Sequence, residues 1–209
     1  MKLYVFPLSP RSIKVLAVAH HLDLPFESVF VDLTKGEHKT PQLLRLNPNG
    51  RMPVLQDGDF ALWESDAIIQ YLADKKPGQL MAADGQGRAL AAQWLAWDLA
   101  DWDAACSILL YEHLVKRFFS DLPADPVRVK EGEERFTKAA TVLDAHLADR
   151  THVLGKELSV VDFALAAPLH YAQSCKFPLS PFENINRWYA HIGTLDAWKK
   201  SAPQPAPGR

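Results

Sequence analysis

The sequence has little cysteine, little net charge and no long apolar run, and each of these absences excludes a class of protein. Its two cysteines, Cys106 and Cys175, are far apart and form no C-x-x-C pair, which predicts free thiols in a reducing compartment, the cytoplasm. No run reaches the roughly eighteen apolar residues of a membrane span, so we expect no membrane partner. The 23 basic and 25 acidic residues nearly cancel, which removes the electrostatic reason to expect nucleic acid.

Metal-ligand spacing is also absent from the sequence. The eight histidines follow no pattern typical of a metal site, and the adjacent His20 and His21 would point in different directions on a helix. We therefore assign no metal. The first six residues are interrupted by Pro7 too early for the apolar core of a signal peptide, and they predict a strand instead.

Residues 1–76 alternate between strand and helix patterns. Strands are expected over 3–6, 26–31, 54–56 and 60–62, and helices over 10–22, over 41–46 and from the Ser65 cap to about residue 75. Ser9-Pro10 is a favourable helix start, because serine is a preferred N-cap and proline suits the first helical position. The resulting order, β-α-β-α-β-β-α, implies a parallel strand pair followed by an antiparallel hairpin, with a polar loop over 32–40.

The rest of the chain predicts helix. After a linker over 77–87, an all-helical domain is expected over 88–200, followed by a flexible tail over 201–209 that is rich in proline and alanine. The expected helices cover 88–119, 127–149, 159–174, 181–192 and 195–200. Pro168 should kink the third of these helices, since it removes a backbone donor and clashes with the preceding turn.

The proline of Met52-Pro53 opens an apolar strand, which is unusual because proline cannot donate to a sheet ladder. A cis bond there would leave the N–H and C=O of Met52 free to pair with an extended peptide ligand. Only about 5–6% of X-Pro bonds in folded proteins are cis, so the local sequence alone favours an ordinary trans turn.

Two serines precede expected helices and suit anionic ligands. Ser65 as an N-cap leaves helix N–H groups directed at a carboxylate, while Glu64 suits an ammonium group, so one α-amino acid head group satisfies both. The Ser9 hydroxyl and its helix dipole would lower the pKa of a ligand thiol from about 8.5. The local sequence alone favours plain helix capping as the role of both serines, and Ser12 is a rival to Ser9.

The order and spacing of these motifs resemble the soluble glutathione transferases over essentially the whole chain. The likeness is greatest to the phi type and to related serine-type bacterial enzymes. The motifs that carry it cover 9–15, 36–41, 46–53, 64–65, 154–155 and 159–162. The last matches the family's capping box, in which Asp162 reaches back to Ser159 and supports folding.

The resemblance implies a thioredoxin-like N-terminal domain, an all-helical C-terminal domain with a hydrophobic substrate pocket, a cis-Pro53 and a homodimer. It implies that Ser9 is the catalytic hydroxyl and that glutathione, the co-substrate, is bound by His38, Lys39, Arg51, Met52, Pro53, Glu64 and Ser65. It places the pocket for a small hydrophobic electrophile at Leu8, Arg11, Leu33, Tyr111 and Val115.

The departures from the pattern of this family include Arg51, Asp66 and, near Ser9, Arg11. Arg51 stands where the phi type usually has glutamine, and Asp66 adds a negative charge beside the expected carboxylate site. The leading interpretation is conjugation of glutathione thiolate to hydrophobic electrophiles. The alternatives are glutathione-dependent peroxide reduction and non-catalytic binding of glutathione or apolar ligands. Serine rather than cysteine at position 9 argues against disulfide-exchange chemistry.

Overall fold

The computed structural model describes residues 1–203, so most of the expected tail over 201–209 lies outside the described residues. These residues form two compact units: the N-terminal unit, 1–81 together with 194–203, and the helical unit, 82–193. The division differs from the expected domains at the last helix, and the expected linker over 77–87 already contains a helix start at Gly85. Helix α9 (Asp196–Ser201) packs against α1 (Pro10–His21), so it belongs to the N-terminal unit.

A mixed four-stranded sheet forms the centre of the N-terminal unit. Its strands are β1 (Lys2–Val5), β2 (Glu27–Phe30), β3 (Val54–Asp57) and β4 (Phe60–Trp63), in the order β2-β1-β3-β4. β1 runs parallel to β2, whereas β3 is antiparallel to both of its neighbours. The expected thioredoxin-like order is confirmed, including the hairpin around Gly58.

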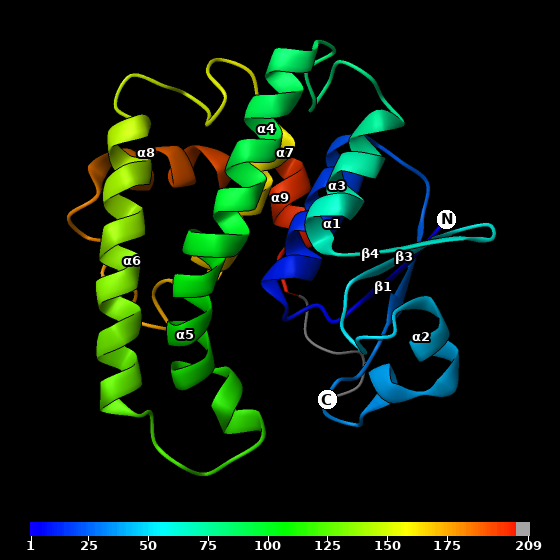
Figure 1. Ribbon diagram of the computed structural model, residues 1–209, viewed down its shortest axis with the longest axis horizontal. Helices are drawn as coiled ribbons and strands as arrows, with labels where there is room; N and C mark the ends of the chain where they lie inside the picture. The colour runs from blue at the N-terminus through cyan, green and yellow to red at the C-terminus, as the bar shows by residue number, and fades with distance from the viewer. Residues whose placement is uncertain (204–209) are drawn as a thin grey trace. The chain divides into compact units, whose positions relative to one another are not determined.

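Three helices follow the strands in the expected order. α1 and α2 (Pro41–Leu46) begin at their prolines, as predicted, and α3 (Ser65–Asp74) follows β4. α1 and α3 lie side by side, with α2 apart from them (Figure 1). Ile13 and Ile68 are fully buried, so each of the two helices contributes an apolar face to the core. A 3-10 turn, Glu37–Lys39, lies within the expected loop over 32–40.

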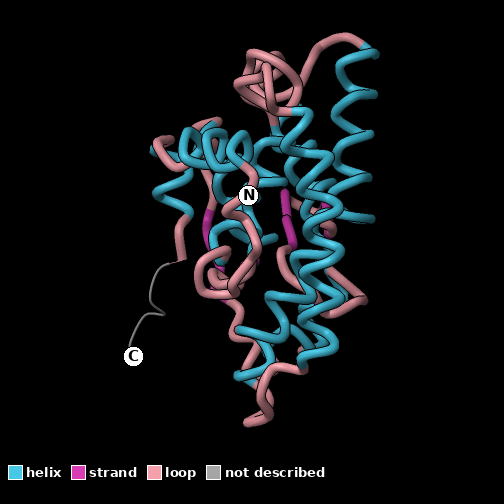
Figure 2. Tube along the Cα trace, turned by 90° about the vertical axis from the view of Figure 1, so that its left-hand side faces the viewer, coloured by secondary structure: helices cyan, strands magenta, loops and turns pink. Residues whose placement is uncertain are grey.

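The described elements of the helical unit are all helices or helical turns. Strands make up only a small part of the chain (Figure 2). Its helices are α4 (Gly85–Trp97), α5 (Asp103–His113), α6 (Pro126–His146), α7 (Val160–Ala166) and α8 (Glu183–Ile192). α5 and α6 pack side by side (Figure 1). None of the helices in residues 1–203 has both the length and the hydropathy of a membrane span.

Two predicted helices are interrupted. The single helix expected over 88–119 is wrong, because a π-helical turn, Asp98–Trp102, separates α4 from α5. Trp102 at its end is fully buried and donates its indole N–H to the Leu165 carbonyl at 2.9 Å. The disruption expected at Pro168 is confirmed, since α7 ends at Ala166 and the chain continues as a 3-10 turn.

The capping box at the start of α7 is confirmed, and its Asp162 makes two further hydrogen bonds outside the motif. Asp162 is fully buried, and its Oδ2 accepts from both the N–H and the hydroxyl of Ser159, at 2.9 and 2.8 Å. Its Oδ1 accepts from the N–H of Val153 and from the indole N–H of Trp188, both at 2.9 Å. One carboxylate therefore joins the start of α7 to the preceding loop and to α8.

A second buried carboxylate closes the connection between α5 and α6. Glu112 accepts from the N–H of Asp125 at 2.8 Å and from Lys116 Nζ at 2.9 Å. These two donors hold the pKa of Glu112 below its ordinary value of 4.5. A lowered pKa means that the charged form stabilises the fold above pH 4.5, and that this contribution is lost as the pH falls through the lowered pKa.

Replacing Glu112 with glutamine is therefore expected to lower the Tm near neutral pH, with the difference from the natural protein shrinking at acidic pH. The measurement is the Tm of both proteins across a pH series. The matched control is Glu157→Gln, because Glu157 is exposed. A Tm difference that stays constant below pH 4.5 would contradict the assignment.

Candidate functional site

The strand register brings three of the predicted site segments to one end of the sheet. Tyr4 of β1 pairs with Val54 of β3, and Val54 in turn pairs with Trp63 of β4. The residues that follow β1, precede β3 and follow β4 therefore emerge at the same end. Ser9, the Met52-Pro53 bond and Glu64 all belong to these three short segments.

Ser9 holds the start of α1 through its backbone, which leaves its side chain available. It occupies the N-cap position, and its carbonyl accepts from the N–H groups of Ser12 and Ile13 at 2.9 and 3.0 Å. Within the described chain its hydroxyl makes no capping hydrogen bond. The rival hydroxyl, Ser12, is fully buried and accepts from the N–H of Phe6 at 3.3 Å. Of the two serines, Ser9 is the less buried, and its hydroxyl is not used to cap α1 within the described chain.

The Met52-Pro53 peptide bond is cis. The trans turn favoured by the local sequence is thus wrong, whereas the cis bond implied by the family resemblance is confirmed. The Met52 side chain is buried in a small core with Tyr4, Leu43 and Val54. Its backbone N–H and C=O have no hydrogen-bond partner in the described part of the chain, so they can pair with an extended ligand.

Asn47, which the sequence reasoning did not single out, shapes the loop before the cis bond. It is buried, and its Nδ2 donates to the Arg51 carbonyl at 2.7 Å while its Oδ1 accepts from the N–H of Asn49 at 3.0 Å. The side chain of Arg51 itself is exposed. The signal was the Asn-Pro-Asn-Gly stretch, since asparagine side chains commonly bond to the backbone two residues on.

His38 lies against the same loop. A side chain at Gly50 would place its Cβ 3.6 Å from the His38 carbonyl and 3.9 Å from the His38 ring. Burial, together with the neighbouring Lys39, lowers the pKa of His38, so the imidazole is neutral near pH 7. Its Nδ1 is buried and has no partner among residues 1–203. Lys39 is exposed beside it.

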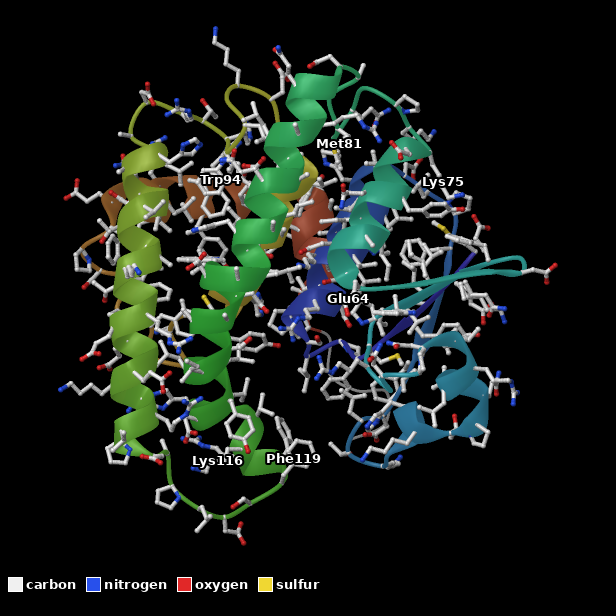
Figure 3. The ribbon with its side chains drawn as sticks, viewed as in Figure 1. Glu64, Lys75, Met81, Trp94, Lys116 and Phe119 are labelled. Carbon is white, nitrogen blue, oxygen red and sulfur yellow. The ribbon has the colours of Figure 1, made fainter. Side chains whose placement is uncertain are left out.

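The start of α3 differs by one residue from the expectation. Glu64 occupies the N-cap position and Ser65 is the first helical residue, so Ser65 as the N-cap is wrong. Glu64 has φ +68°, a region that L-residues rarely adopt, and it is exposed at the junction of β4 and α3 (Figure 3). Ser65 is buried. Backbone strain of this kind is concentrated at functional sites, where the surrounding structure maintains it.

Replacing Glu64 with glycine separates strain from binding. Glycine adopts φ +68° freely and so relieves a cost of about 1–3 kcal/mol, which predicts a Tm no lower than that of the natural protein. Loss of the carboxylate should weaken binding of a ligand that carries an ammonium group about tenfold, as for one charge-assisted hydrogen bond. Glu64→Gln is the control that keeps the shape. A lower Tm with unchanged binding would show that Glu64 is structural only.

The residues expected to line an apolar pocket belong to both units. Leu8 and Arg11 are exposed at the start of α1, and Leu33 packs partly against the Met52 core. Tyr111, on α5, exposes half of its surface, and Val115 begins the 3-10 turn after that helix. Their assembly into one pocket stays a prediction.

Asp66 is paired with a buried lysine. Its Oδ1 lies 2.5 Å from Lys14 Nζ, and both side chains are nearly fully buried. The negative charge expected beside the carboxylate site is therefore compensated from within the fold. Elsewhere in residues 1–203, no group of three or more histidine, cysteine, aspartate or glutamate side chains is placed to hold a metal ion.

Comparison with known proteins agrees with this architecture. Residues 1–74 match the family model for the glutathione S-transferase N-terminal domain, and residues 126–191 match that for the C-terminal domain. A glutathione S-transferase from Hyoscyamus muticus is 32% identical over 207 residues, which cover 96% of this chain and 97% of the relative.

Two solved structures extend the likeness to the fold. Glutathione transferase F7 from Populus trichocarpa has a TM-score of 0.88 at 27% identity, covering 96% of this chain and 97% of its own. A glutathione S-transferase-I bound with the ligand lactoylglutathione has a TM-score of 0.86 at 26% identity, with the same coverage of 96% and 97%. The chain therefore belongs to the glutathione S-transferase family, as its motifs predicted.

Proposed function

We propose that this protein is a glutathione transferase that conjugates the thiolate of glutathione to small hydrophobic electrophiles. The observation that carries the proposal is that three groups lie at one end of the sheet. They are the Ser9 hydroxyl, which does not cap its helix, the backbone of Met52 before the cis-Pro53, and the start of α3. The first suits a thiol, the second an extended peptide and the third a carboxylate. Glutathione carries all three groups, and its derivative lactoylglutathione is bound by a relative of similar fold.

Each part of glutathione has a matching group on the protein. Met52 pairs with the cysteinyl backbone in the manner of an added strand, next to the cis-Pro53. Ser65 at the start of α3 accommodates the γ-glutamyl carboxylate, and Glu64 holds the adjacent ammonium group. His38 and Lys39 approach the glycyl carboxylate, and the exposed Arg51 supplies a further cation.

The reaction then needs no covalent enzyme intermediate. The Ser9 hydroxyl donates a hydrogen bond to the sulfur, and the α1 dipole favours its negative charge, so the thiol loses its proton to solvent near neutral pH. The thiolate attacks the electrophilic carbon, a C–S bond forms, and the leaving group departs with the bonding electron pair. Positioning and thiolate stabilisation supply the rate enhancement.

We propose that Leu8, Arg11 and Leu33 of the N-terminal unit contact the electrophile, and that Tyr111 and Val115 of the helical unit are further candidates for this role. We further propose that the protein works in the cytoplasm as a homodimer with a glutathione site in each subunit. The two buried cysteines are consistent with a reducing compartment.

Capture on immobilised glutathione, followed by an assay with chlorodinitrobenzene and one with cumene hydroperoxide, tests the proposal. Capture with conjugation of chlorodinitrobenzene supports it. Capture with hydroperoxide reduction alone indicates a glutathione peroxidase, and capture without either reaction indicates a binding protein. Failure of capture and of both reactions contradicts a glutathione-dependent function altogether.

A further inference from the structure

A buried ion pair connects the two helices whose starts form the candidate site. Lys14 lies in the second turn of α1, which begins just after Ser9, and Asp66 is the second residue of α3. Lys14 Nζ lies 2.5 Å from Asp66 Oδ1, and the two side chains expose 3% and 7% of their surface. The pair is therefore part of the core between α1 and α3.

Stability alone does not account for this pair. Taking two charges out of water costs free energy that a well-packed apolar pair of similar volume would not cost. Ile13 and Ile69, two core positions near the pair on the two helices, are apolar and fully buried. A pair of apolar side chains would suit such surroundings, so the charges point to a role beyond packing.

The position of Asp66 indicates what that role is. It directly follows Ser65, at the helix end proposed to bind the γ-glutamyl carboxylate. One of its oxygens contacts Lys14, while Oδ2 is buried without a hydrogen bond to any described residue. Charges interact strongly where water is excluded. An uncompensated Asp66 carboxylate would therefore repel a ligand carboxylate at the same helix end.

We propose that Lys14 is a positioning residue that neutralises and orients Asp66, and thereby keeps the start of α3 able to bind the γ-glutamyl carboxylate of glutathione. Lys14 acts through Asp66 and touches no ligand. The inference rests on the proposed function, because it takes glutathione as the ligand.

The test uses four variants of the full chain and two probes. S-methylglutathione carries the γ-glutamyl carboxylate and no thiol, whereas 4-aminobutanoyl-cysteinylglycine lacks that carboxylate. Affinities are measured by titration calorimetry for Lys14→Met, Asp66→Asn and the double variant. The matched control is Lys75→Met, since Lys75 pairs with Asp57 at the opposite end of α3, 2.6 Å away.

Lys14→Met is expected to weaken S-methylglutathione binding about tenfold or more, because a desolvated like charge then lies next to the ligand carboxylate. It should leave the affinity for 4-aminobutanoyl-cysteinylglycine within about twofold. Asp66→Asn and the double variant should bind S-methylglutathione as well as the natural protein does, and so should Lys75→Met. A role in folding alone does not predict this selectivity for one ligand group.

Two results would overturn the inference. The first is a Lys14→Met protein that binds both probes equally well or loses affinity for both equally. The second concerns Asp66→Asn, which remains informative if Lys14→Met does not fold: a selective loss of S-methylglutathione binding in that variant contradicts the proposed repulsion. If the natural protein itself does not bind S-methylglutathione, the proposed function fails, and the inference fails with it.

Discussion

Replacing Ser9 with alanine is expected to lower kcat for conjugation about a hundredfold or more. Removal of one hydrogen-bond donor that stabilises an anion in an active site has an effect of this size in other enzymes. Affinity for glutathione should change by less than about threefold, since a hydrogen bond to a neutral thiol contributes little. The reason lies in the geometry at the start of α1: the Ser9 backbone makes the helix-start bonds, and its hydroxyl caps nothing in the described chain.

A titration of bound glutathione by the ultraviolet absorbance of its thiolate measures the effect directly. In Ser9→Ala the pKa of the bound thiol should rise toward about 8.5, the value of a free thiol. Ser12→Ala is the matched control. The Ser12 hydroxyl is buried and accepts from Phe6, so its loss should lower stability and leave the turnover of folded protein intact. Conjugation that persists in Ser9→Ala, or that disappears in Ser12→Ala, would contradict the role given to Ser9.

The parts of the fold that the sequence predicted well depend on local chemistry. Pro10 and Pro41 each mark a helix start to the residue, because proline fixes φ and lacks the N–H that a first helical residue does not need. The hairpin at Gly58 was likewise encoded by its turn residues. In contrast, the π-helical turn ends at Trp102, whose indole donates a hydrogen bond to Leu165, 63 positions away. No local sequence pattern reveals such a distant contact.

In the candidate site, too, the local sequence predicts some features, while others depend on residues far away in the chain. Ser9 and Ser65 are visible as helix-start residues, although the structure moves Ser65 one position into the helix. The isomer of Met52-Pro53 was not predictable from its neighbours, since trans is the commoner form of any X-Pro bond. Asp66 appeared to be an unpaired charge because its partner, Lys14, lies 52 positions earlier.

Replacing Asp162 with alanine is expected to destabilise the helical unit by about 4 kcal/mol, the scale of leaving partners of a buried charge unsatisfied. The four hydrogen bonds to Asp162 come from three separate segments, at Val153, Ser159 and Trp188. Without the carboxylate, each of these segments keeps a buried hydrogen-bond donor that has lost its acceptor. Chemical denaturation followed by circular dichroism measures the free energy of unfolding, and expression without soluble protein would be the extreme form of the same result.

The graded controls are Ser159→Ala and Trp188→Phe, which each remove one donor and leave the carboxylate bonded. Ser159→Ala should cost about 1 kcal/mol, typical of a lost N-cap. Trp188→Phe should cost more, because the buried indole also leaves a small cavity. If Asp162→Ala costs no more than Ser159→Ala, Asp162 is only a local cap. A larger cost means that Asp162 makes the folding of α7 depend on the packing of α8, because Trp188 reaches Asp162 only once both helices are in place.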